Sequence, residues 1–168
     1  KVGTEKKYVD ALFFAGNTLF VSAHSIDAAG NDLYDLYYYD GTSFTLAGPT
    51  MTGLRYCITD LTYSGGKFWA INQEKVFVGT ADGAGAIVMA ADTTSGSPTS
   101  ISGRLLCGLV VDSSGRVHVS TYDDYLFTFT IADSSWNAGI PISENGKVST
   151  SIHLGKIAEI SKGPSGST

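Results

Sequence analysis

The 168-residue sequence is poor in charge: Asp, Glu, Lys and Arg make up 16% of it, where about 25% is usual for soluble domains. Only 11 residues are Lys or Arg, and the formal net charge is -5. Nucleic-acid-binding faces and polybasic membrane-surface segments both need dense Lys and Arg. We therefore expect no nucleic-acid partner. No apolar run approaches the ~18 residues of a membrane-spanning helix, so we also expect no membrane span.

Cysteine is scarce, and recognisable cofactor motifs are absent. Cys57 and Cys107 are predicted to be two buried thiols, with a disulfide as the alternative if the chain is exported. His24 and His153 have no Cys or His partner at metal-ligand spacing. Residues 27–32 lack the spacing of a calcium loop, and the sequence contains no P-loop, G-x-S-x-G or dinucleotide fingerprint. We predict no metal site and no cofactor.

Glycine and aromatic residues, by contrast, are abundant. The chain has 20 Gly, nine Tyr, eight Phe and two Trp, and its hydrophobic fraction is 43%. Aromatic and β-branched residues fit pleated, half-buried surfaces, and Gly, Asn, Asp and Ser fit turns. The composition predicts an all-β protein with many short strands.

Internal repetition is the strongest signal in the sequence. Three segments each read as strand, tight turn, strand: 13–22, 61–70 and 110–120. Their turns contain Gly-Asn, Gly-Gly and Ser-Gly, which supply the positive φ that short hairpin turns require. Asn17, Gly66 and Gly115 follow one another at steps of 49 residues. Phe20, Trp69 and His118 keep the same step, so we predict that all three pack between repeats and that His118 is not a catalytic base. We predict a constant repeat of 49 residues.

Two further strands follow in each copy. The third strands are predicted at Leu33–Asp40, Ala86–Asp92 and Tyr125–Ala132. A fourth, weaker edge strand is clearest at Ser43–Ala47. The connection between the second and third strands is then long in the first two copies, through Gly30 and Gly83, and short in the third. Four strands in about 49 residues are typical of a β-propeller blade.

The sequence therefore predicts one β-propeller portion over residues 1–168. Its three four-stranded antiparallel blades span about 6–54, 55–103 and 104–152, and the first strand of a fourth blade lies in about 153–168. Three blades leave apolar end faces, and propellers close with about four to eight blades. The chain starts at Lys1 and stops in a predicted hairpin, so we expect a processed form or fragment. Further C-terminal blades, or partner copies in a homo-oligomer, would complete the ring.

Residues 110–121, VVDSSGRVHVST, resemble the D-x-x-G-x-(apolar)-x-(apolar)-x-T core of bacterial propeller repeats. Such repeats occur in two-component regulator propellers, in NHL-type proteins and in many secreted lipoproteins. The Gly65-Gly66 pair is similar to kelch repeats, and the WD dipeptide of WD40 repeats is absent. The resemblance implies an extracytoplasmic module, whether periplasmic, cell-surface or secreted, that binds a ligand or a protein partner.

Basic residues stand just before each predicted first strand: Lys6, Arg55, Arg104 and His153, each 49 residues after the last. In a ring they would form a collar at one mouth of the central channel. Arg55 and Arg104 offer planar guanidinium groups that suit a carboxylate or an acidic sugar. The alternative is that each repeat carries a surface basic residue that pairs locally with an acid.

A tyrosine cluster lies on the predicted third strand of the first copy: Tyr34, Tyr37, Tyr38 and Tyr39. Because side chains alternate along a strand, Tyr37 and Tyr39 share one face and Tyr38 takes the other. We predict packing between repeats for these rings, with sugar stacking by an exposed Tyr as the alternative.

Three functions remain open at this stage. The first is a non-catalytic module that binds a small anionic or carbohydrate ligand, or a protein, through the basic collar or through the loops at 27–32 and 81–85. The second is a structural scaffold whose blades mediate protein–protein contacts. The third is a carbohydrate-active enzyme, which we rank last because Asp60 and Asp112 give no pair of carboxylates that the sequence places together.

Overall fold

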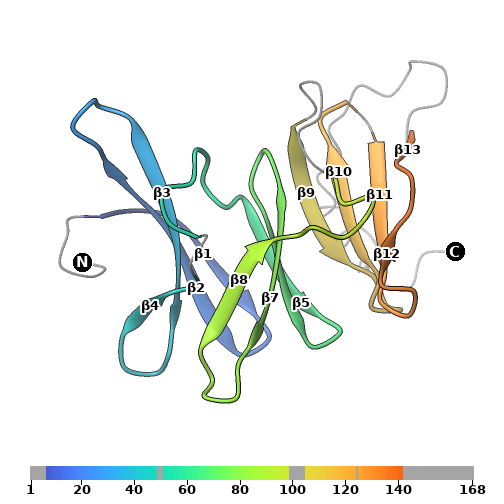
Figure 1. Ribbon diagram of the computed structural model, residues 1–168, viewed down its shortest axis with the longest axis horizontal. Coiled ribbons are helices and arrows are strands. Elements are labelled where there is room, and N and C mark those ends of the chain that lie inside the picture. Colours follow the sequence, from blue (N-terminus) through green and yellow to red (C-terminus); the bar gives the residue numbers. More distant parts are fainter. Residues whose placement is uncertain (1–6, 49–50, 99–104, 124, 142–168) are drawn as a thin grey trace, which may run out of the picture.

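The computed structural model describes residues 7–48, 51–98, 105–123 and 125–141, and these form strands, turns and no helix (Figure 1). The first sheet has the order β1 (Tyr8–Ala15), β2 (Thr18–Ile26), β3 (Asp32–Tyr39) and β4 (Phe44–Leu46). The second has the order β5 (Asp60–Ser64), β6 (Lys67–Ile71), β7 (Val76–Ala81) and β8 (Ile87–Ala91). The third contains β9 (Leu106–Val111), β10 (Val117–Thr121), β11 (Tyr125–Thr130) and β12 (Ser135–Trp136), and β13 (Ile140–Pro141) also pairs with β11. The predicted all-β class is confirmed.

All strand pairs are antiparallel, and tight turns close the first hairpins of the first and second sheets. Gly16 has a φ of 58°, and Gly65 and Gly66 have φ values of 59° and 76°. Only glycine adopts this left-handed region readily, which explains why the repeat has glycine at its first turn.

The predicted third strand of the second copy is wrong. Residues 86–92 contain the fourth strand, β8, and the third strand is β7, which starts at Val76. Gly79 and Thr80 interrupt the apolar run of β7 and weaken its strand signal. The loop with Gly83 therefore joins β7 to β8. The second and third strands are joined by a short turn instead, in which the Asn72 Oδ1 accepts the amides of Glu74 and Lys75 at 2.8 Å each.

Gly79 is required where it stands because the neighbouring strand β8 lies close to β7 at that point. A Cβ there would lie 2.8 Å from the Met89 Cα and closer still to the Val88 carbonyl oxygen. The close approach of β7 and β8 excludes a side chain at this position. Gly79, which weakens the strand signal of β7 in the sequence, is therefore the residue that allows β7 to pair with β8.

The 49-residue step holds for the second strands but not for every first strand. Strand pairing places Leu12 opposite Val21, Leu61 opposite Ala70, and Leu109 opposite Val119. Leu61 follows Leu12 by 49 residues, but Leu109 follows Leu61 by 48. The third hairpin compensates with a longer turn, in which Asp112 Oδ1 accepts the amides of Ser114 and Arg116. The prediction of a constant step is therefore wrong for β9.

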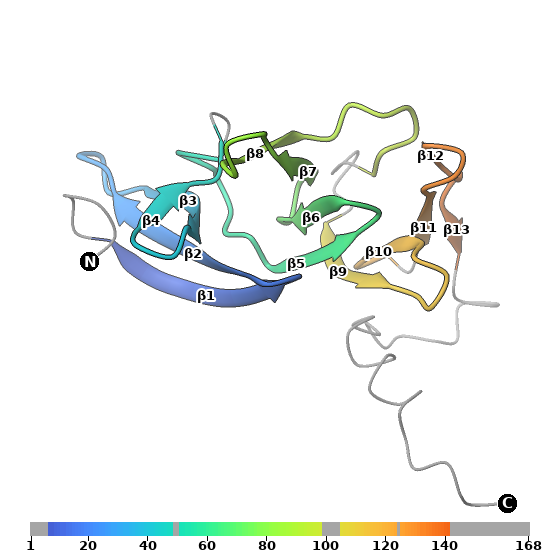
Figure 2. The same cartoon turned by 90° about the horizontal axis from the view of Figure 1, so that it is seen from below.

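The three sheets stand side by side, with their first strands adjacent. Figure 2 shows β1, β5 and β9 in succession along one side, and β1 contacts β5 as β5 contacts β9. Hydrogen bonds join the second and third sheets along these strands. The Leu109 amide donates to Asp60 Oδ2 at 3.1 Å, and the Ser64 hydroxyl donates to the Gly115 carbonyl at 2.7 Å.

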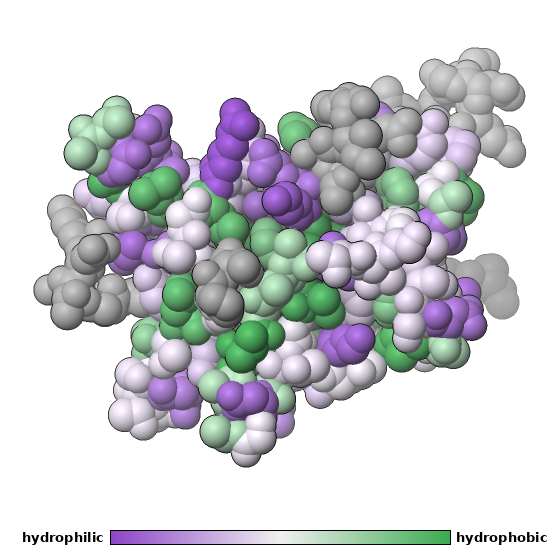
Figure 3. Space-filling model, viewed as in Figure 1, coloured by the Kyte–Doolittle hydropathy of each residue, from purple (hydrophilic) through white to green (hydrophobic). Residues whose placement is uncertain are grey.

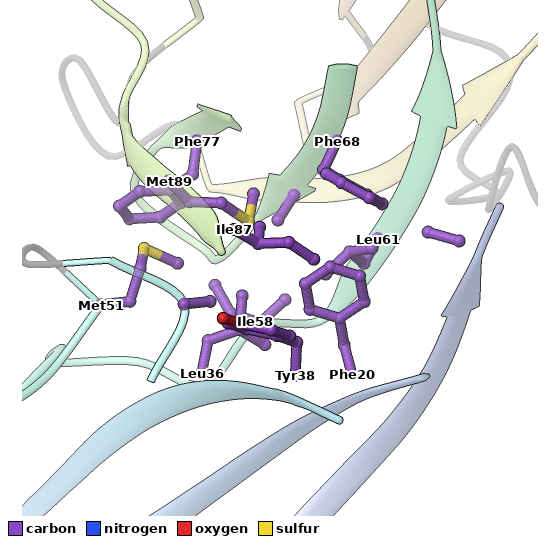
Figure 4. Packing of buried hydrophobic residues seen from close by; sticks show 13 residues of the cluster. Phe20, Leu36, Tyr38, Met51, Ile58, Leu61, Phe68, Phe77, Ile87 and Met89 are labelled. Atoms are coloured by element: carbon purple, nitrogen blue, oxygen red, sulfur yellow. The ribbon is translucent and has the colours of Figure 1, made fainter. Parts of the chain in front are cut away.

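Each space between neighbouring sheets is filled by an apolar core. Figure 4 shows the core between the first and second sheets, which includes Phe20, Leu36, Tyr38, Met51, Ile58, Leu61, Phe68, Phe77, Ile87 and Met89. The second core joins the second and third sheets and includes Trp69, Ile71, Val76, Leu106, Leu109, Val117, Val119, Phe129 and Trp136. Burying each large apolar side chain stabilises the fold by roughly 1.5–3 kcal/mol, so these two interfaces hold the sheets together.

The repeat positions predicted to pack between repeats do so where a neighbouring sheet is present. Phe20 packs against the second sheet, and Trp69 packs against the third. His118 lies on the far face of the third sheet, where its ring bonds Asp112 and Thr128. Of the tyrosines, Tyr38 packs in the first core and is 4% exposed.

The outward face of the first sheet is apolar and open along β1. Val9, Leu12 and Phe14 are 58%, 63% and 76% exposed. The predicted start of a fourth blade lies outside the described residues. In the part of the chain that is described, no helix is long and apolar enough to cross a membrane.

Candidate functional site

One residue of the predicted basic collar can be placed. Lys6, Arg104 and His153 lie outside the described ranges. Arg55 is exposed, its Nη1 lies 3.9 Å from Glu74 Oε1, and its guanidinium lies 5.4 Å from the centre of the Tyr56 ring. At this position, Arg55 therefore follows the alternative prediction, in which each repeat has a surface basic residue that pairs locally with an acid. The collar as a whole stays a prediction.

An acidic and aromatic cluster lies at the end of the first sheet where β1 begins. Asp10 Oδ1 lies 2.7 Å from His24 Nδ1, and Asp32 Oδ1 lies 3.9 Å from His24 Nε2. The His24 ring stacks on Tyr8 at 5.1 Å and contacts Tyr34 at 5.5 Å. Two carboxylates beside the single histidine give this cluster an acidic character, which does not suit an anionic ligand.

Neither cysteine has the character of a nucleophile. Both are free: Cys107 is buried with its Sγ 3.3 Å from Ser120 Oγ, and Cys57 is partly buried. Burial and the charge of Asp10 raise the pKa of the Cys57 thiol. A thiol whose pKa is raised stays protonated at neutral pH, and the thiolate is the reactive form.

His118 is fully engaged in its own hydrogen bonds. Its Nε2 lies 3.0 Å from Asp112 Oδ2, and its Nδ1 lies 3.0 Å from Thr128 Oγ1. Burial alone would raise the pKa of Asp112, but bonds from His118 and Arg116 hold that pKa well below its usual range. The network joins the turn at Asp112 to β10 and β11 and so helps to hold the third hairpin in shape. The described residues contain no cluster of His, Cys, Asp or Glu that fits a metal ion.

A groove lies between the first and second sheets, at the end where their hairpin turns meet. It consists of two pockets that share Thr18, with volumes of about 420 and 460 Å³. Both volumes fall in the range of small-molecule sites. In Figure 1 the four turns that form it lie along the lower edge of the two sheets, and in Figure 3 that edge shows two lobes separated by a notch.

The first pocket lies between the β3–β4 turn and the β7–β8 loop. Its lining residues are Thr18, Tyr38, Tyr39, Asp40, Ala84, Gly85, Ala86 and Ile87. Asp40 is committed to its own turn: the backbone amides of Ser43 and Thr42 lower its pKa to about 2. Asp82 closes the opposite loop by accepting the amides of Ala84 and Ala86 at 2.9 Å each. Both walls are therefore held in shape by Asx-type turns.

The second pocket lies between the first turns of the two sheets. Its lining residues are Gly16, Asn17, Thr18, Tyr63, Gly66, Phe68 and Ala81. Tyr63 is 44% exposed, its ring contacts Phe68 at 4.9 Å, and it lies against Gly16, where an added Cβ would meet it at 3.6 Å. The pocket therefore presents an aromatic ring that its neighbours hold in place.

Several polar side chains of the groove have no partner. Among the described residues, the side chains of Asn17, Thr18, Tyr38 and Tyr63 make no side-chain hydrogen bond. Tyr38 is 4% exposed as a residue, but its hydroxyl is not among the buried polar atoms of the described residues that lack a partner, so the hydroxyl is accessible at the groove. A bound molecule in the groove can supply these partners.

The corresponding place between the second and third sheets is filled. Strand pairing places Phe68 opposite Gly79, and Val117 opposite Phe129. Two residues further along, Ala81 of the second sheet therefore corresponds to Ile131 of the third. Ile131 packs against the second core, and its Cδ1 occupies the space that a Cβ on Gly65 would need. The repeat closes one junction with Ile131 and leaves the other open at Ala81.

The two loops predicted to contact a ligand lie in different surroundings. The loop at 81–85 supplies Ala81, Ala84 and Gly85 to the groove, and its contact with a ligand stays a prediction. The loop at 27–32 is closed on itself, with Asp27 accepting the amides of Ala29 and Asn31 at 2.8 Å each. Thr18 and Tyr63 were not singled out. The signal for them is the contrast between Ala81 and Ile131, which appears only once the third strands are aligned correctly.

A scan against protein-family models and a search of curated proteins both find no match for this chain.

Proposed function

We propose that the chain is part of a β-propeller and that its three sheets are consecutive blades. Three observations support this. Each sheet contains four antiparallel strands in sequence order, to which the third sheet adds β13. The first strands β1, β5 and β9 lie side by side, and an apolar core lies between neighbouring sheets. The resemblance of residues 110–121 to bacterial propeller repeats supports an exported, extracytoplasmic protein.

Within this architecture we propose a non-catalytic binding module whose ligand occupies the groove between the first two blades. The observation that carries the proposal is the groove itself. It is open at Ala81, where the next junction is filled by Ile131, and several of its polar side chains have no hydrogen-bonding side-chain partner within the described ranges. The Asp10–His24 and Asp112–His118 pairs both lie outside the groove, whose lining contains no histidine or cysteine. Binding rather than catalysis fits this arrangement.

The repeat itself provides the test. Ala81→Ile places in the groove the side chain that closes the other junction, and isoleucine suits a strand position. A thermal-shift screen of small molecules identifies ligands, since a bound ligand raises the stability of the folded state. We expect hits on the wild-type chain that Ala81→Ile abolishes. The matched control is Ala90→Ile, an exposed alanine of β8 in strand register with Val78. A screen without hits, or hits that Ala81→Ile leaves unchanged, contradicts the proposal.

A scaffold is the second candidate function, because β1 presents Val9, Leu12 and Phe14 on an open face. Leu12 corresponds to Leu61, which is 6% exposed in the core between the first two sheets. The first sheet thus presents outward the surface that the second sheet buries. Exposed apolar patches of this kind mark protein–protein contacts.

Sedimentation velocity tests the scaffold role. We expect the wild-type chain to self-associate as its concentration rises, and Leu12→Ser/Phe14→Ser to remain monomeric. Tyr122→Ser, at an exposed aromatic of the third sheet, is the control (51% exposed). A wild-type chain that stays monomeric throughout contradicts self-association through β1.

A further inference from the structure

We infer that the groove between the first and second sheets binds a neutral oligosaccharide. This inference rests on the proposed binding function and names the class of ligand. It follows from three properties of the groove: the absence of an available charge, the nature of its unpartnered groups, and its division into two pockets.

The groove offers no charge to a ligand. Its lining contains no Lys, Arg or His, and Asp40 is its one acidic residue. Asp40 already accepts hydrogen bonds from the amides of Thr42 and Ser43 and from the hydroxyls of Ser43 and Thr45. An anionic ligand would find no cation here and would lie beside a carboxylate. A cationic ligand would find that carboxylate's oxygens occupied. A neutral ligand fits.

The available groups suit a molecule rich in hydroxyls. The Asn17 amide and the hydroxyls of Thr18, Tyr38 and Tyr63 all both donate and accept, as sugar hydroxyls do. The exposed Tyr63 ring adds an apolar surface for the C–H face of a pyranose. Three of these four side chains lie in the second pocket and two in the first, with Thr18 in both.

The division of the groove indicates a ligand with linked units. Two pockets of about 420 and 460 Å³ adjoin at Thr18, so a chain of sugars places neighbouring units on either side of that residue. Both pockets are open to solvent along the turns, since Asn17, Ala84 and Gly85 are exposed. An oligosaccharide longer than the groove can therefore extend beyond it. The anionic ligand predicted for the basic collar is of a different chemistry, and Arg55, the one collar residue that the structure describes, is not part of the groove lining.

Isothermal titration with defined hexasaccharides tests the inference. The neutral probes are maltohexaose, cellohexaose, xylohexaose and hexa-N-acetylchitohexaose, and the acidic probe is hexagalacturonate. We expect at least one neutral probe to bind. Tyr63→Ala and Ala81→Ile should each weaken that binding at least tenfold, and Asn17→Ala should weaken it several-fold. Tyr63→Phe, which keeps the ring and removes one hydroxyl, should lose less than Tyr63→Ala.

The controls are matched in residue type. Tyr122→Ala removes an exposed tyrosine of the third sheet, and Ala90→Ile adds the same side chain on β8. Both should leave the dissociation constant within twofold, and so should Arg55→Ala. Circular dichroism of every variant confirms that the fold is kept.

The outcomes separate the inference from the function on which it rests. Binding of hexagalacturonate alone, or binding lost only in Arg55→Ala, overturns the neutral oligosaccharide. If no hexasaccharide binds but Ala81→Ile abolishes thermal-shift hits, the ligand class is overturned and the groove remains a binding site. If Ala81→Ile abolishes the binding of no ligand at all, both the neutral oligosaccharide and the binding function of the groove are overturned.

Discussion

Asp35 forms a buried ion pair on the outward face of the first sheet, and its removal should cost more stability than any other single carboxylate. The Lys7 ammonium donates to Asp35 Oδ2 at 2.7 Å, and the two side chains are 8% and 4% exposed. The Gly53 amide and the Thr52 hydroxyl donate to Oδ1, and the Tyr37 hydroxyl donates to Oδ2. This carboxylate therefore ties the segment before β1 and the loop after β4 to β3.

The size of the effect follows from burial. Asp35→Asn keeps the shape of the side chain but removes the carboxylate charge that the buried Lys7 ammonium contacts, and breaking a buried pair in this way costs about 3–5 kcal/mol. At 2–4 °C per kcal/mol for a chain of this size, Tm should fall by about 6–20 °C. Arg116→Ala is the control, because its ion pair with Asp112 is half exposed and is worth about 0–1 kcal/mol.

The cost of Asp35→Asn should also depend on pH. Burial raises the pKa of Asp35, but the Lys7 ammonium, the Gly53 amide and the hydroxyls of Thr52 and Tyr37 together lower it below its ordinary value. A carboxylate whose pKa is lowered on folding stabilises the fold above its unfolded pKa of about 3.9, and that contribution is lost as pH falls through the folded pKa. The difference between the two proteins should shrink steadily below about pH 4.

Urea unfolding followed by tryptophan fluorescence measures this difference at pH 7 and at pH 3. Lys7→Met/Asp35→Asn should recover part of the loss, because it removes both charges of the buried pair. This double variant can be measured if Asp35→Asn alone is too unstable to study. A cost below about 1 kcal/mol at pH 7, or a cost that is the same at both pH values, refutes the reasoning.

Two further predictions concern the packing of the sheets. Leu61→Ala should lower the free energy of unfolding by about 2–5 kcal/mol, because it leaves a cavity between two sheets. Leu12→Ala, at the corresponding exposed position, should change the free energy of unfolding by less than about 0.5 kcal/mol in the same urea titration. Equal costs would contradict the alignment of β1 with β5. Gly79→Ala should destabilise the fold by about 1–3 kcal/mol, because the new Cβ meets the backbone of β8. A Cβ at Gly83 meets nothing within 4 Å, so Gly83→Ala should be neutral or stabilise the fold by up to about 1 kcal/mol. Thermal denaturation measures both. A tolerated Gly79→Ala would show that β7 and β8 can separate at no cost.

The sequence predicts the sheets well because hairpin chemistry is local. Glycine at Gly16, Gly65 and Gly66 defines the first turns, and alternation along β3 correctly separates Tyr38 from Tyr37. The third strand of the second sheet is missed because Gly79 is required by the close approach of the neighbouring strand β8. A local sequence pattern does not show which strands will lie that close. The shift from 49 to 48 residues is missed for a similar reason: a longer turn at Asp112 restores the register of the second strand.

The groove is less predictable than the sheets. It depends on which side chains meet across two sheets, and on one small residue, Ala81, where the next repeat has Ile131. Composition and charge favour the basic residues before each first strand, because they are rare in an acidic chain. Of these, Arg55 is partnered by Glu74 and exposed. The groove, by contrast, is built from neutral groups that no charge pattern reveals.

Backbone amide chemical-shift mapping on ¹⁵N-labelled protein shows whether the ligand lies between the first and second sheets. With the tightest hexasaccharide, or with a thermal-shift hit, we expect the largest shifts at Asn17, Thr18, Tyr63 and Ala86, with little change at Arg55 or along the outward face of β1. Shifts concentrated at residues 55–57 would place the ligand at the opposite end of the sheets and contradict the account.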